Sequence, residues 1–143
     1  MQSQIYVSLP VKDLDRTVAF FTALGFKFNA QFSNEKAACM VINEGASYVM
    51  LMAEPFFRTF TPRPVPDAKT TAAALISLSQ NSREDVDAIV AKAVAAGGST
   101  LNNPQDHGFM YEHDFEDPDG HLWGVMWMNP AHATAQQATG QPA

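Results

Sequence analysis

The sequence has very little cysteine, little positive charge and no long apolar run. Cys39 is its only cysteine, so neither an internal disulfide nor a cysteine-based zinc site can form. Nine Lys and Arg stand against 15 Asp and Glu, and the net charge of −6 argues against nucleic-acid binding, because few cations are present to neutralise phosphates. No apolar stretch approaches the roughly 18 residues that a membrane-spanning helix needs. We therefore expect no nucleic-acid partner and no membrane partner.

The beginning of the chain lacks the basic start and apolar run of a secretory signal, so we expect a cytoplasmic protein. The length of 143 residues favours one domain or two small fused modules. The hydrophobic content of 46% and the charged content of 17% are typical of a globular chain.

The first half of the sequence predicts a strand, a helix and three further strands. Residues 5–11 form a short apolar run with β-branched residues, which is typical of a strand. Asp13 caps a helix whose apolar residues recur at helical spacing until Gly25 ends the pattern. The three strands are predicted at residues 26–32, 37–42 and 48–53.

The second half predicts the same order of elements after a proline-rich connector, residues 54–70. A strand at residues 74–79 is followed by a helix that Ser82 caps. The buried stripe of this helix is predicted to be Val86, Ile89, Val90 and Val94. A short strand at Thr100 and Leu101 and a hairpin of residues 108–115 and 121–128 complete the unit.

The two halves form a weak internal repeat with a period of about 70 residues. "YVSLP" at Tyr6 overlays "LISLS" at Leu75, and "YVMLMA" at Tyr48 overlays "LWGVMW" at Leu122. The repeat predicts an α+β fold of two βαβββ modules, whose curled mixed sheets enclose a cavity where a ligand would bind. The modules are predicted at residues 1–53 and 71–128, and residues 129–143 are predicted to be a disordered tail.

Two motifs, "VSLPVKDLDRTVAFFTALGF" near the start and "FEDPDGHLWGVMW" near the end, resemble the vicinal oxygen chelate superfamily. This superfamily includes glyoxalase I, the fosfomycin and bleomycin resistance proteins and the extradiol dioxygenases. The resemblance covers residues 5 to about 129. The chain looks most like a glyoxalase or bleomycin-resistance branch whose members mostly lack an assigned reaction.

The resemblance also implies where a metal would be bound. Enzymes of this family hold one divalent ion through His, Glu or Gln at four related strand positions, and these positions fall on Tyr6, Met50, Leu75 and Gly124. Such a set cannot replace imidazoles and carboxylates around a divalent ion. We therefore expect no cofactor and no divalent metal. Gly124 would stand in the place of a metal-binding Glu, and its missing side chain would leave room in the cavity.

The turn at residues 117–120 decides which side chains face this cavity. "DPDG" fits a type I turn followed by a glycine with positive φ, a G1 bulge, which places Gly124 opposite Asp114. Without the bulge, Phe109, Tyr111 and His113 would face inward instead. The predicted lining is Tyr6, Ser8, Tyr48, Met50, Met52, Leu75, Ser77, Met110, Glu112, Asp114, Leu122, Gly124 and Met126.

The sequence leaves three functions open. A metal-free protein that binds a small, partly apolar organic molecule fits the methionine-rich lining, because thioethers adapt to irregular apolar partners. We expect such a protein to be a homodimer. A lyase, isomerase or dioxygenase would need non-standard metal ligands, such as Glu112 and Asp114 with His107 or His113. A metal-free enzyme would use Tyr6, Tyr48, Glu112 or Asp114 as acid and base. Glu112 and Asp114 also fit a solvated strand with no catalytic role.

Overall fold

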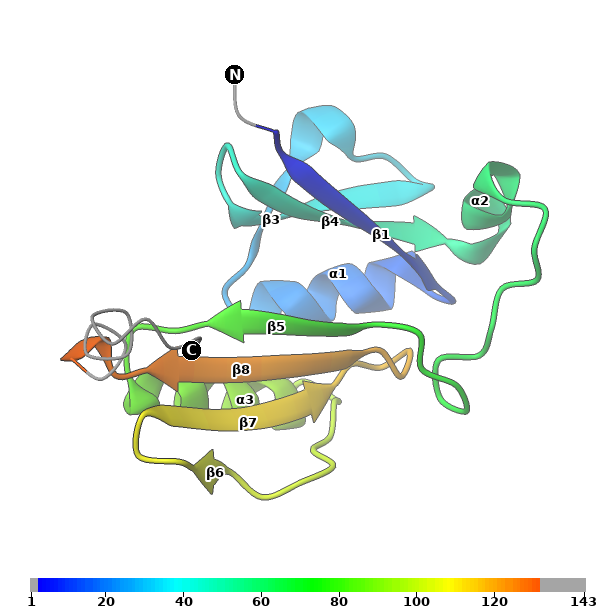
Figure 1. The fold of residues 1–143 in the computed structure, drawn as a ribbon. Helices are drawn as coiled ribbons and strands as arrows, with labels where there is room; N and C mark the ends of the chain where they lie inside the picture. Colours follow the sequence, from blue (N-terminus) through cyan, green and yellow to red (C-terminus); the bar gives the residue numbers. More distant parts are fainter. Residues whose placement is uncertain (1–2, 132–143) are drawn as a thin grey trace. The chain divides into compact units, whose positions relative to one another are not determined.

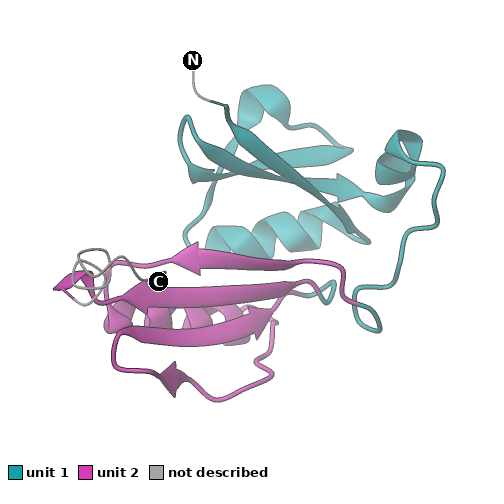
Figure 2. Cartoon of the chain, in the orientation of Figure 1, with its two compact units in different colours: residues 1–71, 118–120 teal, residues 72–117, 121–143 magenta. Residues whose placement is uncertain are grey.

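The computed structural model describes residues 3–131, which form two compact units that each contain one four-stranded sheet (Figures 1 and 2). The first unit extends to Thr71 and also includes Pro118–Gly120, whereas the second contains residues 72–117 and the chain from His121 onward. The α+β fold of two βαβββ modules is confirmed, and neither sheet closes into a barrel. Most of the predicted tail, residues 132–143, lies outside the described residues. Among residues 3–131, no helix combines the length and apolar character needed to cross a membrane.

The helices and strands follow one another in the same order in both units. The first unit contains β1 (Ile5–Val11), α1 (Leu14–Ala23), β2 (Lys27–Asn29), β3 (Ala37–Asn43), β4 (Ser47–Ala53) and α2 (Glu54–Phe57). The second contains β5 (Leu75–Ser79), α3 (Arg83–Ala95), β6 (Gln105–Asp106), β7 (Met110–Glu116) and β8 (Leu122–Met128).

Both sheets have the same topology, which confirms the internal repeat. Their strand orders are β1-β4-β3-β2 and β5-β8-β7-β6, with one parallel pair in each sheet and antiparallel pairs elsewhere. Ser8 pairs with Met50 in the first parallel pair, and Ser77 pairs with Gly124 in the second. The sequence overlay of Met50 on Gly124 therefore matches the register of the two sheets.

Helix α1 packs on one face of the first sheet (Figure 1). The Asp13 side chain accepts a hydrogen bond from the backbone nitrogen of Arg16 at 3.1 Å, which satisfies one of the unpaired donors at the helix start. Phe20 and Phe21 are buried on its inner side. The predicted cap and these two buried rings thus position this helix.

Helix α3 covers one face of the second sheet and begins at the predicted cap, because the Ser82 hydroxyl accepts a hydrogen bond from the backbone nitrogen of Asp85 at 3.0 Å. Val86, Ile89 and Val90 are buried as predicted. The prediction for Val94 was wrong, since its side chain is 50% exposed. The face that packs on β7 passes through the fully buried Ala93 instead.

Two predicted strands differ in the structure because side chains compete for backbone groups. The strand expected at residues 26–32 is only β2, followed by a 3₁₀ turn at Ala30–Phe32, and the Asn29 side chain caps that turn through the Gln31 nitrogen. The strand expected at Thr100 and Leu101 was wrong, because the Leu101 nitrogen donates to the Asp114 carboxylate at 3.1 Å. A single bridge forms earlier, at Ser99, and β6 forms later.

The beginning of the connector was predicted without a helix but contains α2 and a 3₁₀ turn at Arg58–Phe60. Pro55 lies in the first turn of α2, where a missing backbone donor costs nothing. The rings of Phe56 and Phe60 meet edge to face at 5.1 Å.

The turn between β7 and β8 has the predicted bulge. Gly120 has φ of +97°, the Asp117 nitrogen donates to the His121 oxygen at 3.0 Å, and Asp114 pairs with Gly124. The buried Asp117 carboxylate also accepts hydrogen bonds from the backbone nitrogen of His121 and from the Trp123 indole nitrogen. These bonds hold the register of the hairpin.

Asp119, in the same turn, belongs to the first unit and is only 4% exposed. Its carboxylate accepts hydrogen bonds from the Lys12 backbone nitrogen at 2.8 Å and from the Thr17 hydroxyl at 2.9 Å. The Arg16 guanidinium lies 3.4 Å away. The carboxylate therefore holds the loop between β1 and α1 and the first turn of α1.

Replacing Asp119 by Ala is expected to lower the free energy of unfolding by about 2–4 kcal/mol, because a buried hydroxyl and a backbone nitrogen lose a charged acceptor. Urea unfolding followed by circular dichroism measures this change. The matched control is Asp15→Ala, which removes the same charge from an exposed position in the first turn of α1. This change is expected to lower the free energy of unfolding by less than about 1 kcal/mol. Equal losses in the two variants would contradict the prediction.

Candidate functional site

The helix-free face of the second sheet carries all the cavity-lining residues that were predicted from this unit. Cross-strand partners in a sheet point to the same side. Leu75 pairs with Leu122, Ser77 with Gly124, Ser79 with Met126, Glu112 with Met126, Asp114 with Gly124, and Met110 with Met128. The alternate residues Phe115, Trp123 and Val125 are buried on the side of α3.

The helix-free face of the first sheet carries the lining residues that were predicted from the first unit. Tyr6 pairs with Tyr48, Ser8 with Met50, and Met52 follows on β4, whereas Leu51 lies on the opposite side of the sheet. Cys39 pairs with Met50 on this face and is buried. Burial, assisted by the charge of Glu44, raises the pKa of the Cys39 thiol, so this side chain acts as a small apolar group rather than a nucleophile.

Much of the helix-free face of the second sheet is open to solvent. Leu75 is 74% exposed and Ser77 is exposed, while Leu122, Gly124 and Met126 are half-buried. A large apolar side chain that stays exposed beside hydroxyls and thioethers marks a surface that a partly apolar molecule could cover.

Gly124 lies against Ser77. A Cβ atom at Gly124 would stand 2.8 Å from the Ser77 Oγ, closer than real Cβ atoms approach, while the Ser77 Cβ would be an ordinary 3.6 Å away. The Ser77 hydroxyl therefore takes the space beside Gly124. The expectation from the sequence that this space would be left open was wrong. Glycine fits this position because the Ser77 side chain of the neighbouring parallel strand approaches it closely.

Glu112 and Asp114 share a face but have separate partners. The Glu112 carboxylate lies 3.3 Å from the His107 Nε2, in an exposed pair. Asp114 accepts hydrogen bonds from the Leu101 backbone nitrogen at 3.1 Å and from the Asn102 side-chain nitrogen at 2.8 Å, and so anchors the loop before β6. Glu112 is therefore paired with a histidine, whereas Asp114 has a structural role. A catalytic role for either residue stays a hypothesis.

A polar cluster on the helix side of the second unit was not predicted. The Arg83 guanidinium lies 4.9 Å from the centre of the Trp127 ring and 3.2 Å from Asp106. The Gly108 backbone nitrogen, with a smaller contribution from Arg83, lowers the pKa of Asp106. A hydrogen bond to Asp87 at 2.7 Å raises the pKa of Tyr111. These contacts join β6 and β7 to α3.

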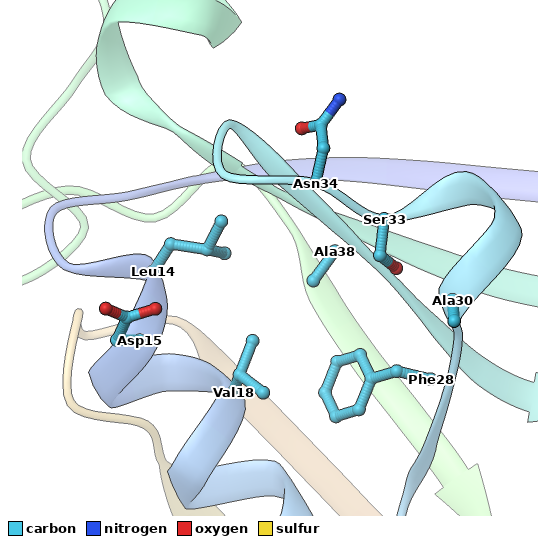
Figure 3. Close-up of a pocket in the computed structure, with 8 residues that line it drawn as sticks. All are labelled: Leu14, Asp15, Val18, Phe28, Ala30, Ser33, Asn34 and Ala38. Carbon is cyan, nitrogen blue, oxygen red and sulfur yellow. The ribbon is translucent and has the colours of Figure 1, made fainter.

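A pocket of about 340 Å³ in the first unit was also missed (Figure 3). It lies on the helix side of the sheet, since Ala38 pairs with Leu51 and not with a residue of the helix-free face. Its lining comprises Leu14, Asp15, Val18, Phe28, Ala30, Ser33, Asn34 and Ala38. Figure 3 shows the side chains of Leu14, Val18 and Phe28 converging on the pocket while the Asn34 amide points away. Small alanines facing a helix were the only sequence signal for this space.

The sequence matches the family model of the Glyoxalase/Bleomycin resistance protein/Dioxygenase superfamily over residues 3–125. The chain belongs to this superfamily. Among curated proteins, no sequence matches it significantly.

Solved structures of the superfamily have the same fold. A hypothetical protein from S. aureus is 29% identical, with a TM-score of 0.75 over 89% of this chain and 94% of that one. A glyoxalase-related enzyme from Fulvimarina pelagi is 19% identical, with a TM-score of 0.76 over 91% and 90% of the two chains. The fosfomycin resistance protein FosX from Listeria monocytogenes is 20% identical, with a TM-score of 0.64 over 90% and 93%.

The residues at the four positions that the resemblance assigns to a metal do not fit one. Gly124 has no side chain and Leu75 has no donor atom, while Met50 offers a thioether. The Tyr6 hydroxyl is engaged as a donor to the Gln4 side chain at 3.0 Å. Within residues 3–131, no three His, Cys, Asp or Glu side chains gather closely enough to hold a metal ion. No metal-dependent step can be derived from these residues.

The contact between Gly124 and Ser77 predicts a coupling between two substitutions. Gly124→Ala in the natural background is expected to be neutral or destabilising, because the Ser77 hydroxyl must move. With Ser77→Ala already present, the same change is expected to stabilise the fold by about 0.5–1 kcal/mol, because alanine restricts the unfolded chain. A double-mutant cycle in urea measures both values, and equal effects in the two backgrounds would exclude the contact.

Proposed function

We propose that this protein binds a small, partly apolar organic molecule on the helix-free face of one of its sheets, without a divalent metal. The observation that supports the proposal most strongly is the chemistry of these faces. A phenol, a thioether, a leucine and a glycine stand at the four positions where metalloenzymes of the resembled family carry ligands, and further thioethers and hydroxyls surround them. Apolar lining with a few polar groups is typical of small-molecule sites.

Asp114 is the less suitable of the two acidic residues for general-base catalysis, because both of its carboxylate oxygens are held by the loop before β6. Glu112 is paired with His107 at the exposed face. Structures of a glyoxalase/bleomycin resistance protein and of a fosfomycin resistance protein are among those with the same fold.

Native mass spectrometry of protein purified without chelators tests this function. We expect a bound organic molecule that denaturation releases, and well under one equivalent of nickel, zinc, iron or manganese. Ser8→Leu on the first sheet and Ser77→Leu on the second each place an apolar side chain on a helix-free face, and one of the two is expected to reduce the bound molecule. The matched control Ala30→Leu alters the pocket of Figure 3 instead and is expected to retain it.

Two results would overturn the proposal. One is a stoichiometric metal that Glu112→Ala or Asp114→Ala removes. The other is a bound molecule that is lost with Ala30→Leu but kept with both Ser8→Leu and Ser77→Leu, which would assign it to the pocket of the first unit.

We also propose that the chain forms a homodimer. β5 lies at the edge of the second sheet, and exposed strand edges favour pairing with another chain. Leu75 is an exposed apolar side chain on this strand. Multi-angle light scattering at micromolar concentration is expected to give twice the chain mass, and the mass of one chain would refute the dimer. A cytoplasmic location stays a prediction.

A further inference from the structure

Two tyrosines on the helix-free face of the first sheet form a stacked pair. Tyr6 on β1 and Tyr48 on β4 are direct partners in the parallel register. Their ring centres are 4.8 Å apart and their planes differ by 13°. This separation equals the spacing of neighbouring strands, so the two rings stand side by side and continue the spacing of the sheet.

Both hydroxyls are held by a short chain of hydrogen bonds. The Tyr6 hydroxyl donates to the Gln4 Oε1 at 3.0 Å, and the Gln4 Nε2 donates to the Gly45 oxygen at 3.2 Å. The Gly45 nitrogen donates to the Tyr48 hydroxyl at 2.7 Å. Gly45 has φ of +82° in the tight turn between β3 and β4. The rings are therefore oriented before any ligand arrives, which reduces the entropy lost on binding.

One face of this stack remains open. Tyr48 is only 6% exposed, whereas Tyr6 is 50% exposed although Tyr48 covers one side of its ring. β1 is an edge strand, so no strand of the first sheet covers the other side of the ring. An exposed ring with a fixed orientation offers a surface on which a third ring can stack.

The side chains next to the open ring indicate what kind of molecule fits. Ser8 follows Tyr6 on the same face and is exposed, and its partner Met50 is half-buried. None of these side chains carries a charge, while the chain as a whole has a net charge of −6. Such a surface suits an uncharged molecule and disfavours an anion. Sulfur also packs well against aromatic edges.

From this geometry we infer that the ligand is an uncharged planar aromatic molecule that stacks on the outer face of the Tyr6 ring and extends the pair formed with Tyr48. This inference rests on the proposed function and specifies the class of its ligand. Tyr6 thus serves as a stacking platform at a position where a metalloenzyme of the family would carry a ligand.

The test compares 2-naphthol with decahydro-2-naphthol, which has the same skeleton and hydroxyl but no aromatic ring. Titrations followed by NMR give both dissociation constants. We expect 2-naphthol to bind about three- to tenfold more tightly, because ring stacking adds to the burial of apolar area. The Tyr6 ring protons are expected to shift upfield with 2-naphthol only.

Substitutions at Tyr6 separate stacking from other contacts. Tyr6→Leu is expected to abolish the preference for the aromatic compound, whereas Tyr6→Phe, which keeps the ring and loses the hydroxyl, is expected to retain a preference. Thermal unfolding of each variant shows that it is folded, and light scattering gives its oligomeric state.

The outcomes distinguish failure of the inference from failure of the proposed function. Equal binding of the two compounds, or a preference that survives Tyr6→Leu, would overturn the stacking while leaving small-molecule binding intact. Shifts at Phe28 in place of Tyr6 would assign the ligand to the pocket of Figure 3 and overturn the inference. A dimer that Tyr6→Leu dissociates would show that a second copy covers the ring, and would overturn the inference. Binding of neither compound would also overturn the inference, and native mass spectrometry of the purified protein then tests the proposed function separately.

Discussion

The register of the hairpin formed by β7 and β8 is the constraint on which the second unit depends. The bulge at Gly120 and the bonds made by Asp117 set Asp114 opposite Gly124. Because side chains alternate along a strand, a shift of β7 by one residue against β8 would exchange the two faces of β7. Phe115 would then leave the side of α3, and Glu112 and Asp114 would turn toward it. The four residues of this turn thus determine which side chains lie on the helix-free face of the second sheet.

The same turn also contributes to the first unit. Asp117 bonds within the second unit, while Asp119, two residues later, gives its buried carboxylate to Lys12 and Thr17. A charged group with few contacts to water is tolerable here because two hydrogen-bond donors and a nearby guanidinium compensate for its desolvation. The acidic residues of the "DPDG" motif therefore serve the fold and are not available for chemistry.

The two helix-free faces differ although they derive from the same repeat. In the first sheet, the partners Tyr6 and Tyr48 form a stacked aromatic pair. At the equivalent place in the second sheet, Leu75 and Leu122 are aliphatic, and two residues further on the Ser77 hydroxyl fills the space beside Gly124. One unit thus presents aromatic rings and the other presents aliphatic groups, hydroxyls and carboxylates. A repeat in the backbone does not impose a repeat in the chemistry.

The sequence by itself determined the order of the elements, the caps at Asp13 and Ser82, the bulge at Gly120 and the residues that share each face. These depend on interactions between neighbours in the chain and on the period of two along a strand. Only the tertiary structure decided that Ala93 replaces Val94 in the core, that Asp114 draws Leu101 out of a strand, and that Ser77 occupies the space at Gly124. Each of these outcomes depends on the distance between atoms that are brought together by packing, and such distances have no counterpart in the spacing of residues along a chain.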